Sequence, residues 1–313
     1  MTGQDHETGG GVPHDTGRRC GFVALIGAPN AGKSTLLNRL VGAKVSIVTH
    51  KVQTTRSLVR GIAIRGEAQI VFVDTPGIFS PRRRLDAAMV RSAWAGASDA
   101  DLVVMIADAR KGLDEDAEAI LAKLRDIPHR RFLALNKIDG MRRDKLLEVT
   151  AAFNAALPFE ATFMISALTG DGVDDLMAAL AEAMPPGPWL YPEDQISDFP
   201  MRQLAAEITR EKLYLRLHQE LPYESHVETE AWTERKDGSV RIEQTIYVAR
   251  ESQRAIVLGK NGRTIKEIGA ASREELAAIL EVPVHLFLFV KVRESWADDP
   301  ERYREMGLEF PRD

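Results

Sequence analysis

The sequence predicts two domains, an α/β domain with a mostly parallel sheet followed by a smaller α+β domain. A chain of 313 residues is too long for one small core and suits two domains of ordinary size. Between residues 22 and 184, short apolar runs alternate with amphipathic helical stretches, which is typical of a parallel sheet covered by helices. Prolines are then frequent in residues 185–200, and the order of the elements changes beyond them.

The first domain is expected to contain six strands. Only four residues separate the second strand from the third, which is too short for a parallel crossover. These two strands should therefore form a hairpin and give the sheet one antiparallel edge. The strands are expected at residues 22–26, 58–64, 69–73, 102–107, 132–135 and 162–165.

The second domain is expected in the order helix, strand, strand, helix, helix, strand. These elements are placed at residues 201–221, 226–233 and 240–249, at two helices flanking 259–262, and at 284–292. Residues 1–18 are rich in Gly, Thr and Asp and lack an apolar period, so we expect a disordered leader. The predicted boundaries are leader 1–18, first domain 19–184, linker 185–200 and second domain 201–313.

Composition limits the classes of protein. Apolar residues make up 44% and charged residues 28% of the chain, as in ordinary globular proteins. The sequence contains no apolar run of the ~20 residues that a membrane-spanning helix needs, and no apolar signal-peptide core. The single cysteine, Cys20, fits a reducing compartment, so we expect a cytoplasmic protein. The net charge of -5 means that any nucleic-acid site must be local.

A phosphate-binding loop directly follows the first predicted strand. The pattern G-x-x-x-x-G-K-[ST] stands there in its required strand-loop-helix context. Backbone N–H groups of such a loop surround the β-phosphate, Lys33 bridges the β- and γ-phosphates, and Ser34 holds Mg²⁺. The residues expected to bind the phosphates are Gly27, Ala28, Pro29, Asn30, Ala31, Gly32, Lys33, Ser34 and Thr35.

Two further segments point to the same metal and phosphates. Asp74 ends the third strand and begins the motif D-T-P-G, where its carboxylate can hold Mg²⁺ and the Gly77 N–H can meet the γ-phosphate. Residues 53–56 read Q-T-T-R, and we expect Thr55, in preference to Thr54, to complete the Mg²⁺ shell. The alternatives are an ordinary turn and an ordinary Thr-rich loop. Lys33, Thr55 and Gly77 are the predicted catalytic residues.

The base is predicted to be guanine. The motif N-K-I-D, residues 136–139, closes the fifth strand, and the Asp139 carboxylate can accept from guanine N1–H and N2–H₂. Adenine offers no such pair of donors, so it would leave the carboxylate unpaired. A backbone N–H of the tripeptide after the sixth strand can meet guanine O6. The residues expected around the base are Asn136, Lys137, Asp139, Ser166, Ala167 and Leu168.

With these five signals in order, the first domain resembles the translation-factor-related GTPases. It departs from the Ras-like pattern at Ile78, where Ras-like enzymes place the glutamine that orients the attacking water. In GTPases with a hydrophobic residue here, an Asn of the phosphate loop can recruit K⁺, and Asn30 occupies the matching position. The resemblance implies a K⁺ site at Asn30. The alternative is that Asn30 serves only the conformation of the loop.

A G-x-x-G loop lies between the two predicted helices of the second domain, and this arrangement resembles KH domains of type II. Such a loop lets the sugar-phosphate backbone approach closely because glycine has no Cβ. Five Lys or Arg face two Glu between Arg250 and Glu267, a local charge of +3. Ile256, Leu258, Ile265 and Ile268 should mostly pack in the core. The predicted RNA contacts are Gly259, Lys260, Asn261, Gly262, Arg263 and Lys266. The alternative is a solvated charged surface.

The combination of both domains is similar to the Era family of GTPases across residues 20–310. The linker motif Y-P-E-D, residues 191–194, fits the same family. The resemblance implies binding of GTP and GDP, and of the 3′ end of 16S ribosomal RNA, during maturation of the small ribosomal subunit. It also implies a peripheral contact with the inner membrane, and we expect a monomer. Residues 82–84, three arginines, could touch RNA or anionic lipid, or form a solvated turn.

Two other classes of function are weighed against an RNA-coupled GTPase switch. A membrane-acting GTPase would be expected to carry a membrane-spanning segment or a strongly amphipathic basic helix in place of the G-x-x-G domain. A passive RNA-binding protein would be expected to have a decayed nucleotide site, whereas Lys33, Ser34, Asp74 and Asp139 are all intact.

Overall fold

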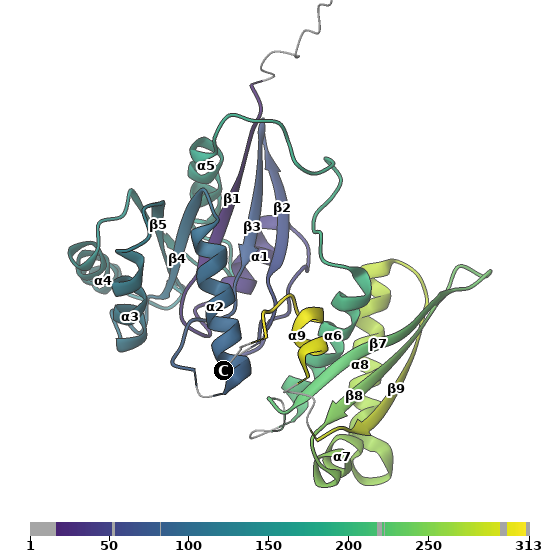
Figure 1. The fold of residues 1–313 in the computed structure, drawn as a ribbon. Helices are drawn as coiled ribbons and strands as arrows, with labels where there is room; N and C mark the ends of the chain where they lie inside the picture. Colours follow the sequence, from purple (N-terminus) through teal and green to yellow (C-terminus); the bar gives the residue numbers. More distant parts are fainter. Residues whose placement is uncertain are drawn as a thin grey trace, which may run out of the picture.

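The computed structural model describes residues 17–51, 54–81, 83–217, 221, 223–294 and 299–310. Gln53 and Arg82, which belong to segments singled out above, lie outside the described residues, as do residues 1–16 of the predicted leader. The described chain forms an α/β domain followed by a smaller α+β domain, which confirms the predicted fold class (Figure 1).

The first domain is built on a six-stranded sheet with the order β2-β3-β1-β4-β5-β6. β2 runs antiparallel to β3, and the other neighbouring pairs are parallel, so the predicted hairpin and antiparallel edge are confirmed. Every predicted strand is present, and most extend beyond the predicted ends because pairing with a neighbour continues there. The strands are β1 Arg19–Ile26, β2 Val59–Arg65, β3 Ala68–Asp74, β4 Leu102–Asp108, β5 Arg130–Asn136 and β6 Ala161–Ile165.

Helices cover both faces of this sheet. α1 (Lys33–Val41) and α5 (Val173–Ala183) pack on one face, while α2 (Arg84–Ser98), α3 (Glu115–Leu124) and α4 (Arg143–Ala156) pack on the other. β3 and β4 are buried along their whole length, as a sheet covered on both sides requires. The carboxyl ends of the parallel strands meet at one edge, and the loops with the nucleotide motifs follow there.

The proline-rich linker is an ordered strap along the first domain. The buried side chain of Gln69 accepts hydrogen bonds from the backbone N–H groups of Leu190 at 2.8 Å and Tyr191 at 3.0 Å. Farther along, the N–H of Ile62 donates to the carbonyl of Ile196 at 2.8 Å. Prolines suit this path because the strap runs beside the sheet without joining it as a strand. It leads from α5 to the second domain (Figure 1).

The second domain packs helices on one face of a three-stranded sheet, order β7-β8-β9, in which β7 and β8 are antiparallel and β8 and β9 parallel. The predicted order of elements is confirmed. The elements are α6 Met201–Arg216, β7 Ser225–Glu234, β8 Val240–Val248, α7 Glu251–Leu258, α8 Arg263–Leu280 and β9 Val284–Val292, with a short 3-10 turn, η1, at Lys260–Gly262.

The prediction for α6 was too long, because the helix ends at Arg216 and not at residue 221. Leu217 adopts an extended conformation with φ -94° and ψ 153°. This change of direction lets Leu217 and Leu221 both enter the core of the second domain. Apolar periodicity continues to residue 221 although the helix does not, so the pattern alone could not locate the end.

A short C-terminal helix, α9 (Pro300–Glu305), was not predicted. Asp299 caps it by accepting a hydrogen bond from the N–H of Glu301 at 3.0 Å, and Pro300 suits its first turn. Tyr303, which is fully buried, packs with Met89 of α2 in a small hydrophobic cluster. α9 therefore links the end of the chain to the first domain, and it lies between α2 and β7 in Figure 1.

Candidate nucleotide-binding and RNA-binding sites

The phosphate loop turns sharply at the end of β1. A Cβ on Gly27 would lie 2.2 Å from the carbonyl oxygen of Ile106, so only glycine allows this turn. Lys33 opens α1 and is buried, and its ammonium donates to the carbonyl oxygens of Gly27 at 3.1 Å and Ala28 at 3.0 Å. The loop therefore folds around the amine of the lysine predicted to bridge two phosphates.

Burial makes the charge of Lys33 responsive to a bound anion. Burial lowers the pKa of its ammonium to about 8, although the negative charge of Asp74 acts in the opposite direction. A phosphate chain in the loop would add negative charge beside the amine and favour its charged form. The site is thus arranged so that an anion completes it.

Three oxygen ligands suited to Mg²⁺ converge beside the loop. The Ser34 hydroxyl donates to the Asp74 carboxylate at 2.6 Å and lies 2.9 Å from the Thr55 hydroxyl, which is 3.4 Å from the same carboxylate. Burial raises the pKa of Asp74, while the positive charge of Lys33 and hydrogen bonds from Ser34, Ser46 and Thr55 oppose that rise. Hydroxyl and carboxylate oxygens suit a hard cation such as Mg²⁺. The structure therefore brings the three predicted metal ligands together.

One oxygen of the Asp74 carboxylate supports the metal assignment independently. Its Oδ1 is buried and, among the described residues, accepts no hydrogen bond, whereas Oδ2 takes all three hydroxyl contacts. A buried carboxylate oxygen is costly to leave without a partner. A metal ion or a water molecule that it holds would satisfy this atom. In the described parts of the chain, His, Cys, Asp and Glu do not gather in groups of three that could hold a metal, so a site here depends on hydroxyl groups.

Gly77 lies directly against the phosphate loop. A Cβ there would approach Pro29 to 3.0 Å, which would force the two segments apart. The next residue, Ile78, donates its N–H to the Gly27 carbonyl at 3.1 Å and buries its side chain in the core. Gly77 therefore lies beside the phosphate loop and lines the same pocket, and the Ile78 side chain has no polar group to orient water.

The residues predicted to surround the base come together at the ends of β5 and β6. The Asn136 amide donates to the Ala31 carbonyl at 2.8 Å and accepts from the Ala167 N–H at 2.9 Å, so it ties two motifs to the phosphate loop. The Ser166 hydroxyl donates to the Asp139 carboxylate at 2.6 Å. This hydrogen bond helps to fix the orientation of the Asp139 carboxylate, which is predicted to accept two hydrogen bonds from guanine.

Leu168 is the exposed member of the predicted base site. Its side chain is 71% exposed, whereas Ala167 is buried. The Leu168 carbonyl accepts a hydrogen bond from Arg39 of α1, and so does the Ala167 carbonyl, at 3.3 Å. The structure therefore holds the backbone of this tripeptide and leaves the Leu168 side chain at the surface.

Asp108 is a site residue that the sequence analysis missed. The Lys137 ammonium donates to Asp108 at 2.9 Å and also to the Asn30 carbonyl, so it bridges the base motif and the phosphate loop. Burial acts to raise the pKa of Asp108, but hydrogen bonds from Arg110 and Lys137 outweigh it and lower the pKa to about 2. Its place as the last residue of β4, beside the other strand ends, was the available signal.

Asn30 has a conformation that suits its residue type. Its φ of 61° lies in the left-handed region, which Asn tolerates better than most residues. Its amide donates to the His50 carbonyl at 2.9 Å, so it also contacts the connection that follows α1. Both facts support the conformational alternative considered for this residue. Its contact with K⁺ stays a prediction.

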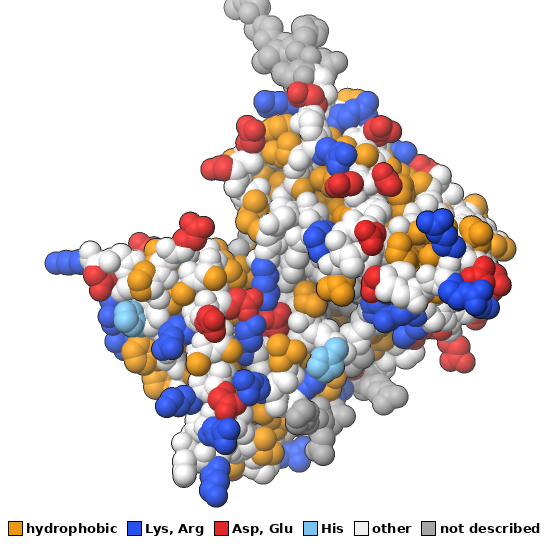
Figure 2. Space-filling model, turned by 180° about the vertical axis from the view of Figure 1, so that it is seen from behind, with side chains coloured by type: hydrophobic (Ala, Val, Ile, Leu, Met, Phe, Trp, Pro, Cys, Tyr) orange, Lys and Arg blue, Asp and Glu red, His pale blue; other side chains and the backbone are white. Residues whose placement is uncertain are grey.

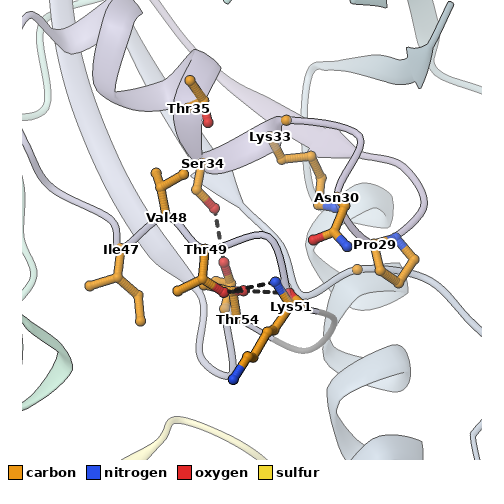
Figure 3. Close-up of a pocket in the computed structure, with 13 residues that line it drawn as sticks. Pro29, Asn30, Lys33, Ser34, Thr35, Ile47, Val48, Thr49, Lys51 and Thr54 are labelled. Carbon is orange, nitrogen blue, oxygen red and sulfur yellow. Dashed lines mark hydrogen bonds between the residues drawn. The ribbon is translucent and has the colours of Figure 1, made fainter. Parts of the chain in front are cut away.

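The connection between α1 and β2 closes over the phosphate loop and lines a pocket with it. Figure 3 shows Pro29, Asn30 and Lys33 on one side of this pocket and Val48 and Thr49 on the other. The hydroxyl groups of Thr49 and Thr54 are hydrogen-bonded to each other at 2.7 Å. Thr54 therefore holds the local loop, whereas Thr55 faces the metal ligands, as expected.

The G-x-x-G loop lies between α7 and α8, as predicted. Gly259 has φ 72°, and a Cβ there would lie 2.1 Å from the Thr264 hydroxyl, so glycine is required. Gly262 has φ 73°, but a Cβ there would meet nothing within 4 Å. Asn261 adopts φ 54° and is exposed. Gly262 therefore leaves open space where the predicted RNA backbone would approach.

The predicted RNA-contacting side chains are exposed, although part of their charge is balanced. Lys260 and Lys266 are exposed. In Figure 2, Lys and Arg side chains gather over the lower left of the molecule, where the second domain lies. Arg263 pairs with Glu267 at 3.0 Å. The local charge of +3 already counts Glu267, so this ion pair engages the Arg263 side chain without lowering that net charge.

The expectation for the aliphatic residues around this loop holds in part. Ile268 is fully buried and Ile265 packs against the same core, but Ile256 is 55% exposed. α7 turns Gln253 and Val257, four residues apart, toward the core, so Ile256 falls on the outer face.

The arginines that follow the D-T-P-G segment are partly engaged. Arg83 precedes α2 and lies 3.8 Å from Glu224 of the second domain, and Arg84 is exposed. Of the helices that the structure describes, none is both long enough and apolar enough to cross a membrane. The contact that the resemblance implied with lipid thus remains a proposal.

Comparisons with known proteins agree with this geometry. Residues 22–137 match a family model described as a 50S ribosome-binding GTPase, and residues 220–297 match one described as a KH domain. The chain is 68% identical to GTPase Era of Agrobacterium fabrum over 310 residues, covering 98% of each chain. It is 67% identical to GTPase Era of Rhizobium meliloti over 313 residues, covering 100% of this chain and 99% of the relative.

Two solved structures are similar over nearly the whole chain. One is a variant of Aquifex aeolicus Era bound to GDP and aluminium fluoride, with TM-score 0.88, 38% identity, and coverage of 92% of this chain and 99% of that one. The other is Era in complex with MgGDPNP and nucleotides 1506–1542 of 16S ribosomal RNA, with TM-score 0.88, 38% identity, and coverage of 93% and 99%. Both share the fold of this chain across its two domains, and the chain belongs to the Era family of GTPases.

Proposed function

We propose that this protein is a GTP-hydrolysing switch that binds the 3′ end of 16S ribosomal RNA through its KH domain and acts in maturation of the small ribosomal subunit. The observation that carries the first part is the meeting of Ser34, Thr55 and Asp74, since these three oxygen ligands come from three separate segments. A relative solved with MgGDPNP and a 16S fragment supports both parts. The proposed domains are residues 19–184 and 201–313, joined by 185–200.

Each residue of the nucleotide site has a proposed task. Lys33 stabilises negative charge on the β- and γ-phosphates, Gly77 donates its N–H to the γ-phosphate, and Asp139 accepts from guanine. Ser34, Thr55 and Asp74 would hold Mg²⁺, which supplies positive charge where the leaving phosphate becomes more negative. Since Ile78 cannot orient the attacking water, positioning and charge stabilisation carry the hydrolysis.

A K⁺ ion beside Asn30 is proposed as a further source of positive charge. The amide oxygen of Asn30 is a suitable ligand, and Asn30 lines the same pocket as Lys33 and Ser34. In this proposal, K⁺ supplies the stabilisation that other GTPases obtain from a partner's arginine.

The RNA is proposed to lie against the G-x-x-G loop. The open space at Gly262 and the exposed ammonium groups of Lys260 and Lys266 support a close backbone approach. Asn261 and Arg263 complete the proposed contacts. We also propose a cytoplasmic monomer whose contact with the inner membrane is peripheral.

Crosslinking in cells followed by sequencing of bound RNA tests the assigned role. The 3′ end of 16S ribosomal RNA should be the enriched target. A titration with fluorescent GTP and ATP on the purified protein should give binding for the guanine nucleotide alone. Absence of small-subunit RNA among the crosslinks would refute the ribosomal role, and binding of neither nucleotide would leave a passive RNA-binding protein.

A further inference from the structure

The connection that carries Thr55 lies along α6 of the C-terminal domain. The N–H of Val48 donates to the Glu211 carboxylate at 2.8 Å, and the Lys44 ammonium pairs with the same carboxylate at 2.7 Å. The Lys51 ammonium donates to the Leu217 carbonyl at the end of α6. A segment of the nucleotide domain is therefore held by a helix of the RNA-binding domain over much of its length.

Arg56 extends this contact into the interior of the C-terminal domain. Its side chain is 2% exposed, and its guanidinium donates to the Ser225 carbonyl at 2.9 Å, the Tyr214 hydroxyl at 2.9 Å and the Tyr223 carbonyl at 3.1 Å. These acceptors lie on α6, at the start of β7 and just before it. A guanidinium presents several donors in a fixed plane, so three partners hold it in one orientation.

Arg210 makes a contact in the opposite direction. It belongs to α6, its side chain is 1% exposed, and its guanidinium donates to the Thr54 carbonyl at 2.5 Å. The Glu207 carboxylate accepts from the Arg210 Nε at 2.7 Å and keeps the guanidinium aimed at that carbonyl. The residues on both sides of Thr55 are thus held by the C-terminal domain.

Anchoring both neighbours restricts the residue between them. Peptide planes leave two soft dihedrals at each residue, and consecutive Cα atoms are a fixed ~3.8 Å apart. With the Thr54 carbonyl and the Arg56 side chain fixed, Thr55 has little freedom to leave its place 2.9 Å from the Ser34 hydroxyl. This threonine is the proposed metal ligand that closes over GTP.

We propose that Arg56 and Arg210 are positioning residues through which the docked C-terminal domain holds Thr55 in the Mg²⁺ site. The inference rests on the proposed function, since it needs Mg²⁺ and GTP at this site. By linkage, a ligand that moves the C-terminal domain away from this segment weakens retention of Mg²⁺ with GTP, and GTP with Mg²⁺ resists that movement to the same degree. An RNA that moves the C-terminal domain would therefore act on the metal site through these two arginines.

The test measures the Mg²⁺ concentration that half-maximally slows release of a fluorescent GTP analogue from the full-length protein. Arg56→Ala should raise this concentration about tenfold, within the usual range of coupling between linked sites. Release of the matching GDP analogue should change less than about twofold, because Thr55 joins the metal only when the γ-phosphate is present. Arg56→Lys should recover part of the loss, and Arg210→Ala should act in the same direction as Arg56→Ala.

Arg60→Ala is the matched control. Arg60 lies four residues after Arg56 and pairs with Asp198 of the linker at 2.8 Å, but it does not flank Thr55. Its replacement should leave the Mg²⁺ dependence within about twofold of wild type, because this contact is not coupled to the metal site. Thermal unfolding confirms that each variant is folded. If Arg56→Ala fails to fold, Arg210→Ala and Arg56→Lys carry the comparison.

The outcomes separate positioning from general loosening and from loss of the proposed function. A wild-type Mg²⁺ requirement in folded Arg56→Ala and Arg210→Ala would overturn the inference. If Arg56→Ala, Arg210→Ala and Arg60→Ala all weakened retention of GTP and GDP equally, the contact would be purely structural and the inference would be overturned. Failure of wild type itself to retain GTP in a Mg²⁺-dependent way would instead overturn the proposed function, and the inference with it.

Discussion

The Ser34 hydroxyl donates a 2.6 Å hydrogen bond to the carboxylate of Asp74. The two residues are 40 positions apart, and they meet because β1 and β3 are adjacent parallel strands whose carboxyl ends lie side by side. Asp74 ends β3, and Ser34 follows the end of β1 closely enough to reach the same point. The proposed metal site is therefore a direct product of the strand order.

Lys33→Ala should weaken binding of GTP severely. It removes a buried ammonium whose charged contact with phosphate is worth about 3 kcal/mol, so the dissociation constant should rise on the order of 100-fold. Titration with a fluorescent GTP analogue measures the change. Equal affinity in wild type and variant would reject the assignment of this loop.

Asp139→Asn should shift the preference from guanine toward xanthine. An amide presents a donor where guanine also has one, whereas xanthine offers an acceptor at that position. Ser166, which donates to Asp139 at 2.6 Å, can donate to the amide oxygen of Asn instead. Competition between GTP and XTP measures the shift, and an unchanged preference would place the base elsewhere.

Hydrolysis of GTP should be faster in K⁺ than in Na⁺ at equal ionic strength. The reason is that K⁺ beside Asn30 would add positive charge at the phosphates in a site that lacks the water-orienting glutamine. Asn30→Ala should abolish the difference. Asn30→Gly also removes the amide but keeps the left-handed conformation, so it shows whether the loss comes from the missing ligand or from a changed loop. Equal rates in the two salts would refute the K⁺ site.

Gly262→Asp should reduce RNA binding by at least about tenfold, because it places a negative charge where a phosphate is expected. A Cβ at Gly262 meets nothing within 4 Å, so the cost in the free protein is limited to the φ of 73°. Gly262→Asn has similar size and tolerates this conformation without the charge.

Binding of a 16S 3′-end oligonucleotide by the folded variants measures that effect. GTP affinity should stay near wild type, because Gly262 lies outside the nucleotide motifs. If Gly262→Asp binds the RNA as tightly as wild type, the RNA does not use this loop.

The His226 side chain should make stability fall in acid. Burial and the positive charges of Arg56, Arg302 and Arg210 lower the pKa of His226 from 6.5 to about 3. The unfolded chain takes up the proton below pH 6.5 while the folded chain does not, so its contribution is complete above that pH and is lost as pH falls toward 3.

The loss should approach about 1.4 kcal/mol for each pH unit within that window. Urea unfolding of wild type and His226→Gln at several pH values measures the difference between them. The free energy of unfolding of wild type should fall relative to that of His226→Gln as pH falls. Parallel curves across the window would contradict the low pKa of His226.

The sequence alone could predict the elements whose causes are local. The phosphate loop, the β2–β3 hairpin and the G-x-x-G loop each depend on residue types at fixed spacing within one segment. The end of α6 and the existence of α9 could not be predicted in this way. Burial of Leu217 in the core of the second domain and of Tyr303 against Met89 decides them, and both contacts reach beyond the local segment.

Each nucleotide motif could be predicted separately, because the residue types that bind phosphate, metal or base lie within a few consecutive residues. Asp108 was missed because its role depends on Lys137, which comes from a different strand end. In the sequence, Arg56 could be recognised only as the last residue of the motif Q-T-T-R. The tertiary structure alone decided that it enters the C-terminal domain while Arg210 reaches back to Thr54, because contacts between residues more than 150 positions apart depend on how two finished domains pack.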